Sequence, residues 1–120
     1  MMESDKDPLA TATQDALIVI AGASGTASRD LRPGLSLTAD LGLDDEGLAL
    51  VAGYLQRIAE RIRGLPPVLP FDVDVLRDAL VWQALVAMFA QADREDLDAD
   101  AIRGLIAIAL GRLRGVDDGG

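Results

Sequence analysis

The sequence predicts an all-α protein built as one domain, and three observations support this prediction. The chain has 120 residues, enough for one hydrophobic core and too few for two. Half of its residues are hydrophobic but only 3% are aromatic, so the core must be aliphatic. Apolar residues recur at spacings of three and four, the repeat of an α-helix. We expect a disordered leader at residues 1–8, a helical domain at 9–115 and a frayed tail at 116–120.

The first helix is expected over residues 9–22, where the apolar side chains form one stripe: Leu9, Ala12, Ala16, Val19 and Ile20. Gly22 and Gly25 are expected to end it. A long connection follows at residues 24–43, and loops of this length usually have a packing or functional role. Its leucines can anchor it to the core: Leu31, Leu35, Leu37, Leu41 and Leu43.

The second helix has the strongest sequence signals. Asp44 is a suitable N-cap, and Asp45 and Glu46 fall in the first turn, where the helix dipole favours carboxylates. A continuous apolar seam follows in steps of three and four: Leu48, Val51, Leu55, Ile58 and Ile62. Gly64 and the prolines after it are expected to end this helix.

A third long helix is expected from Asp72, its N-cap, to about Ala92. Gln83 is the only polar residue within residues 79–90, so this helix must be covered on nearly all sides. The cover is either the other helices or a second copy of the chain.

A last helix is expected to begin at Asp98 or Asp100 and to end at Gly115. Its apolar face can cover the third helix, and it consists of Ile102, Leu105, Ile106, Ala109 and Leu113.

Composition excludes several classes of function. The chain has no cysteine and no histidine, which removes thiol nucleophiles, disulfides and the commonest metal ligands. Its net charge of −9 repels phosphate backbones, so we expect basic protein surfaces as partners and no nucleic acid. No apolar run is long enough to span a membrane, and the acidic start is unlike a signal peptide, so the expected location is cytoplasmic.

Two motifs that suggest ligands lack features that those ligands require. The apolar run before Gly22 and Gly25 looks like a dinucleotide-binding loop, but residues 29–34 do not continue as the helix such a loop requires. The alternating aspartates 96, 98 and 100 look like a calcium loop, which needs glycine at its sixth position and glutamate at its twelfth. Those positions hold Ala101 and Ala107, so we expect no metal.

The segment from residue 31 to residue 45 contains a motif formed by Pro33, Ser36, Leu37, Asp40, Leu41, Gly42 and Asp44. This motif resembles that of the acyl carrier protein family, and the wider resemblance covers residues 13–90. It implies an acyl-carrier-protein-like four-helix bundle with a long first loop, here with an additional C-terminal helix. The family's serine, which receives the phosphopantetheine arm, is replaced by Asp45, and the leucine after it by Glu46.

A phosphopantetheine arm needs a hydroxyl at that helix start, and Ser36 lies upstream of the position. The resemblance therefore implies a non-catalytic protein without a cofactor, which docks on or regulates enzymes of acyl, polyketide or peptide biosynthesis. The expected partner surface, which steers basic partners, consists of Asp40, Leu43, Asp44, Asp45 and Glu46.

Three alternatives stay open. The first is a helical structural protein that oligomerises through residues 79–90 and 102–110. The second is a small enzyme using Asp40 or Asp45 in a deep pocket. The third is a resemblance of residues 40–51 to mercury-regulator-type transcription factors and chaperone modulators, which place a basic helix-turn-helix unit before that segment.

Overall fold

The computed structural model describes residues 6–63, 73–92 and 97–119, and every regular element within these ranges is a helix. In chain order they are α1 (Lys6–Ser24), the 3-10 turn η1 (Ser28–Asp30), α2 (Asp45–Arg63), α3 (Val73–Arg77), α4 (Val81–Gln91) and α5 (Ala99–Gly119). The described ranges contain no strand, and their backbone forms one isolated bridge between Ser36 and Leu80. The all-α prediction is confirmed.

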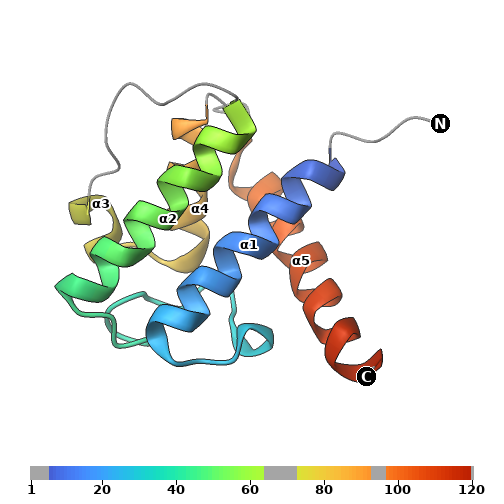
Figure 1. The fold of residues 1–120 in the computed structure, drawn as a ribbon, viewed down its shortest axis with the longest axis horizontal. Helices are drawn as coiled ribbons and strands as arrows, with labels where there is room; N and C mark the ends of the chain where they lie inside the picture. The colour runs from blue at the N-terminus through green and yellow to red at the C-terminus, as the bar shows by residue number, and fades with distance from the viewer. Residues whose placement is uncertain (1–5, 64–72, 93–96, 120) are drawn as a thin grey trace.

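The four longer helices form two layers. α1 and α2 lie side by side and antiparallel, with α4 behind α2 and α5 crossing behind α1 (Figure 1). α4 also contacts α5, and the short α3 contacts both α2 and α4. The shortest dimension of the molecule is 23 Å, which fits two layers of helices about 10 Å across.

The core is aliphatic, as the composition predicted, with a single buried aromatic side chain among the described residues. Phe89 is fully buried among side chains from every long helix: Leu17, Ile20, Leu48, Leu55, Leu85, Met88, Ile102 and Ile106. The predicted seam of α2 is confirmed, because Leu48, Val51, Leu55 and Ile58 are buried and Ile62 packs against them. The hydroxyl of Thr13, also buried, donates to the Leu9 carbonyl at 2.8 Å.

α1 is longer than predicted at both ends. It begins at Lys6, inside the expected leader, while residues 1–5 lie outside the described part of the chain. It continues past Gly22 to Ser24, and Gly25, at φ +74°, ends it instead. The Thr26 N–H donates to the Ala21 carbonyl at 3.0 Å, which is the long hydrogen bond of a Schellman motif.

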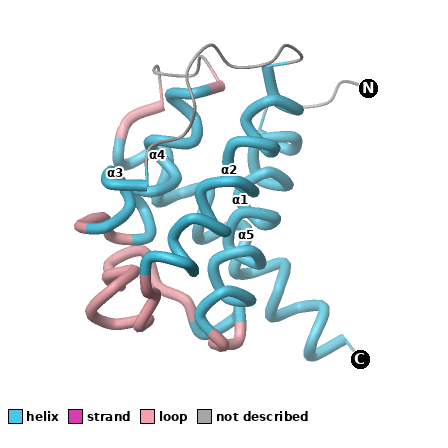
Figure 2. Tube along the Cα trace, turned by 60° about the vertical axis from the view of Figure 1, so that its left-hand side comes forward, coloured by secondary structure: helices cyan, strands magenta, loops and turns pink. Residues whose placement is uncertain are grey.

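The long connection after α1 gathers at one end of the helices (Figure 2). Its leucines anchor it as predicted: Leu31, Leu37 and Leu43 are buried, and Leu35 and Leu41 pack against the core. Three backbone hydrogen bonds also join it to the chain before and at the start of α4. The Leu37 N–H donates to the Ala79 carbonyl (3.2 Å), and the N–H groups of Val81 and Trp82 donate to the carbonyls of Leu35 (2.9 Å) and Pro33 (3.1 Å).

The prediction of one helix from Asp72 to Ala92 is wrong. The structure has two helices, α3 and α4, separated at residues 78–80. The hydrogen bonds to the connection replace helical bonds at this break, and the Gln83 side chain accepts the Leu80 N–H at 2.9 Å, which gives α4 its own start. Asp72 lies outside the described residues.

Much of the apolar surface of α4 is covered by other helices of the same chain. Val81, Ala84, Leu85, Met88 and Phe89 are buried, and α5 contributes the side chains predicted to cover them, including Ile102, Leu105, Ile106 and Ala109. Other helices of the chain therefore supply most of the cover that the sequence required.

α5 begins where the sequence predicted and ends later. The Asp98 carboxylate accepts the Ala101 N–H at 2.8 Å and so caps the helix. The helix passes Gly115 and reaches Gly119, through most of the tail expected to fray, because each interior glycine costs about 1 kcal/mol and does not by itself end a helix. None of the helices in the described ranges combines the length and the apolar character needed to cross a membrane.

Candidate functional site

The chain reaches the start of α2 through a compact turn at residues 36–42. The Asp40 carboxylate accepts the Ser36 N–H at 2.7 Å, and the Ser36 hydroxyl accepts the Ala39 N–H at 3.1 Å. The Gly42 N–H donates to the Thr38 carbonyl at 3.1 Å, and the φ of Gly42 is +71°. The turn therefore uses Asp40 and Ser36 for its own geometry.

Asp44 caps α2. Its carboxylate accepts the Gly47 N–H at 2.8 Å, and its carbonyl accepts the first helical hydrogen bond from Leu48 at 2.8 Å. Leu43, just before the cap, is buried with Leu48, an arrangement known as a hydrophobic staple. An added Cβ on Gly47 would lie 3.0 Å from Cδ2 of Leu43, so glycine leaves room for that leucine.

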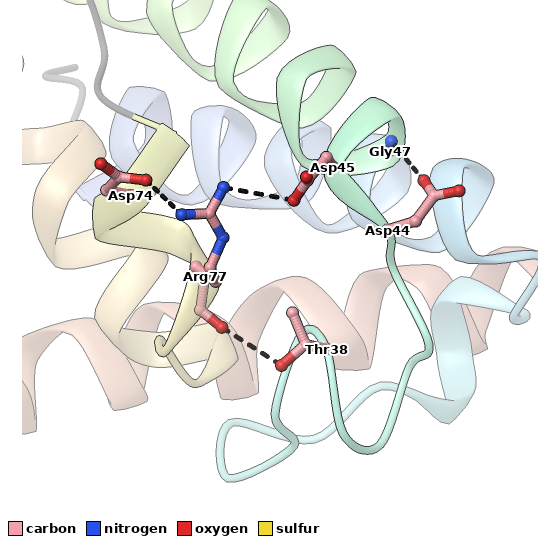
Figure 3. A network of polar contacts seen from close by, with 6 residues as sticks. All are labelled: Thr38, Asp44, Asp45, Gly47, Asp74 and Arg77. Atoms are coloured by element: carbon pink, nitrogen blue, oxygen red, sulfur yellow. Dashed lines mark hydrogen bonds and ion pairs between the residues drawn. The ribbon is translucent and has the colours of Figure 1, made fainter.

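Asp45, the first residue of α2, pairs with Arg77 at the end of α3 (Figure 3). The Arg77 guanidinium donates to the Asp45 carboxylate at 3.2 Å through one nitrogen and to the Asp74 carboxylate through another. The hydrogen bond to Asp45, followed by the charge of Asp74, raises the pKa of Arg77 above its ordinary value. Arg77 therefore remains a cation beside the start of α2.

The backbone of Arg77 is fixed as well as its side chain. The Thr38 hydroxyl donates to the Arg77 carbonyl at 3.1 Å, which ties the turn to α3 (Figure 3). Together with the pair between Asp45 and Arg77, this bond links three segments at one place: the turn, the start of α2 and the end of α3.

The structure brings the five predicted partner-binding residues together but gives them different roles. Asp45 and Glu46 are exposed at the start of α2, with the Asp45 side chain 84% exposed. The carboxylates of Asp40 and Asp44 are also exposed, yet each accepts a backbone N–H. Leu43 is buried, so it supports this surface from below.

Sequence reasoning missed Arg77. It lies 32 residues from Asp45 in the chain, and it was placed inside an expected long helix with no sign that it would meet α2. Its spacing of three from Asp74 indicated only a local pair on one helix face.

The two hydroxyl groups in the turn beside this surface have partners within the protein. The hydroxyl of Thr38 is engaged with a carbonyl, and the hydroxyl of Ser36 caps its turn. No group of three metal-ligating side chains occurs in the described residues.

A hollow of about 280 Å³ lies elsewhere, between α1 and α2, where Arg61 pairs with Asp15 at 3.1 Å. Its lining residues do not include Asp40 or Asp45.

The surface at the start of α2 therefore has a defined geometry, an excess of carboxylates and one fixed cation. No protein-family profile, curated protein or solved structure matches the chain.

Proposed function

We propose that this protein is an acyl-carrier-protein-like docking protein that carries no prosthetic group. It binds basic surfaces of enzymes in acyl, polyketide or peptide biosynthesis through the start of α2. The observation that carries this proposal is the position of Asp45, at the first residue of α2, directly after a long connection and paired with a short α3.

The order of elements supports the proposal. A first helix, a long connection, a second helix with an acidic start, a short third helix and a fourth helix follow one another as in the resembled family. The short helix of this order is α3, Val73–Arg77, which lies between α2 and α4 in the described residues.

The pair between Asp45 and Arg77 supports the absence of a prosthetic arm. In the wild-type protein the side chain at residue 45 is a carboxylate, and it is engaged by the Arg77 guanidinium at 3.2 Å. A carboxylate also cannot form the phosphodiester that a serine forms.

The charges support docking of a basic partner. Asp40, Asp44 and Glu46 are exposed around Asp45, and Asp74 and Asp78 add exposed carboxylates on and after α3. A surface of this sign steers a cationic partner toward it and raises the association rate more than the affinity.

The test of this proposal restores the missing hydroxyl. The wild-type protein, Asp45→Ser and Asp44→Ser are each incubated with a promiscuous phosphopantetheinyl transferase and coenzyme A, and intact masses are measured. We expect one phosphopantetheine arm on Asp45→Ser alone. Asp44→Ser is the matched control, because serine keeps the N-cap but places its hydroxyl one residue early. Modification of the wild type, or no modification of Asp45→Ser, would contradict the proposal.

The other hypotheses receive less support. The apolar residues at 79–90 and 102–110 that suggested an oligomer pack mainly inside the protein, so they need no second copy. The enzyme hypothesis needs a deep pocket around Asp40 or Asp45, and both residues are exposed. The transcription-factor hypothesis needs a helix-turn-helix unit before residue 40, where the described chain has α1, a 3-10 turn and the long connection.

A further inference from the structure

The side of α2 that faces away from the core presents an exposed stripe of six residues: Glu46, Ala49, Leu50, Gly53, Tyr54 and Arg57. They recur at spacings of three and four, so they lie on one face of the helix. Leu50 is 54% exposed and Tyr54 48% exposed, which is high for large apolar side chains. We call these six residues the outer stripe.

The outer stripe is not flat. Five of its residues, from Ala49 to Arg57, line a shallow hollow of about 190 Å³. An added Cβ on Gly53 would meet no heavy atom within 4 Å, so the floor of the hollow is open to an incoming side chain. The stripe therefore offers two projecting side chains, Leu50 and Tyr54, beside two small residues, Ala49 and Gly53.

The stripe also has charges of opposite sign at its two ends. Glu46 stands at one end and Arg57 at the other, about 16 Å apart along the helix at 1.5 Å per residue. The Arg57 guanidinium lies over the Tyr54 ring, 5.7 Å from its centroid, and this contact holds the cation along the stripe.

This pattern is complementary to itself when reversed. If two stripes meet antiparallel about a two-fold axis opposite the midpoint between Val51 and Ala52, Glu46 of one faces Arg57 of the other. In the same register, Leu50 faces Gly53 and Tyr54 faces Ala49, so each large side chain meets a small one. A two-fold interface requires this reciprocal matching of one patch with itself.

We propose that the outer stripe binds a second copy of this chain, with the two α2 helices antiparallel. The interface is distinct from residues 79–90 and 102–110, and it does not depend on the carrier-like role proposed above. One helix face buries less area than a standard interface, so the dimer is weak, with a dissociation constant on the order of 100 µM. Since Glu46 belongs to both surfaces, dimerisation and docking of a basic partner compete.

Sedimentation equilibrium between about 10 µM and 1 mM tests the proposal, and we expect a reversible monomer–dimer equilibrium. Glu46→Arg and Arg57→Glu should each weaken the dimer about tenfold, because both charge contacts become repulsive. The double variant Glu46→Arg/Arg57→Glu should recover the wild-type constant to within about threefold, since the pairs are restored in reverse. All of these positions are exposed, and circular dichroism verifies that each variant keeps its helices.

Ile108→Asp is the matched control, because Ile108 is 42% exposed on α5 and lies outside the stripe; it should leave the equilibrium unchanged. Leu50→Asp, which removes a similar exposed side chain from the centre of the stripe, should abolish the dimer. A wild-type monomer at every concentration would overturn the proposal. A double variant that dimerises no more tightly than the single variants would also overturn it, because exchanging the two charges restores the contacts only if the helices pair antiparallel. Neither result affects the phosphopantetheine test, so the two proposals can fail separately.

Discussion

The carboxylate of Asp44 accepts the N–H of Gly47 at 2.8 Å, and this one hydrogen bond fixes where α2 begins. It satisfies a donor that has no partner inside the helix. It also makes Asp45 the first residue of α2, where its carboxylate pairs with Arg77.

Removing this cap should destabilise the protein. We expect Asp44→Ala to lower the free energy of unfolding by about 1 kcal/mol, because the Gly47 N–H loses its acceptor. Asp44→Asn keeps an acceptor oxygen and should lose only a few tenths of a kcal/mol. Urea denaturation followed by circular dichroism measures both. Equal losses for the two variants would show that charge, and not the hydrogen bond, is what matters at this position.

Gly47 should behave unlike an ordinary helical glycine. A Cβ there would stand 3.0 Å from Cδ2 of Leu43 and 3.4 Å from the Asp44 carboxylate, so Gly47→Ala must displace the leucine that anchors the connection. We expect a loss of about 1 kcal/mol in stability. The control is Gly104→Ala on α5, where nothing lies within 4 Å and alanine should raise stability by about 0.5–1 kcal/mol. A gain for Gly47→Ala as large as that of the control would contradict the packing of Leu43.

Gly42 and Gly34 allow a similar comparison within the connection. Gly42 has a φ of +71°, which costs a residue with a side chain about 1–2 kcal/mol, so Gly42→Ala should lose that amount of stability. Gly34 has open space around its Cβ position and no positive φ, so Gly34→Ala should stay within about 0.5 kcal/mol of the wild type. Thermal unfolding of the two variants and the wild type measures both changes in stability. A loss at Gly34 equal to that at Gly42 would indicate that any side chain disturbs the connection.

The sequence was sufficient for features that depend on neighbouring residues. The seam of α2 and the cap at Asp44 follow from short-range patterns, and the structure confirms both. The cap of α5 was predicted as Asp98 or Asp100, and the structure uses Asp98. The anchoring leucines of the connection were also predictable, because an apolar residue in a long loop must find the core to be tolerated.

The sequence was insufficient where distant segments decide the outcome. From Leu76 to Met88 the apolar spacing continues without a break, so it predicted one helix; the break depends on hydrogen bonds to Pro33, Leu35 and Leu37. Arg77 was missed for the same reason, since its partner Asp45 is far away in the chain. Leu43 was placed on the partner surface, although its position before an N-cap is typical of a buried staple.

The bridge between the connection and the start of α4 sets an order of assembly during synthesis. Residues 33–37 form their backbone hydrogen bonds only with residues 79–82. In a nascent chain that ends before residue 79, the connection that leads to α2 therefore lacks these hydrogen bonds. A ribosome stalled before residue 79 would present a chain in which the connection before the acidic start of α2 is not yet fixed to the start of α4.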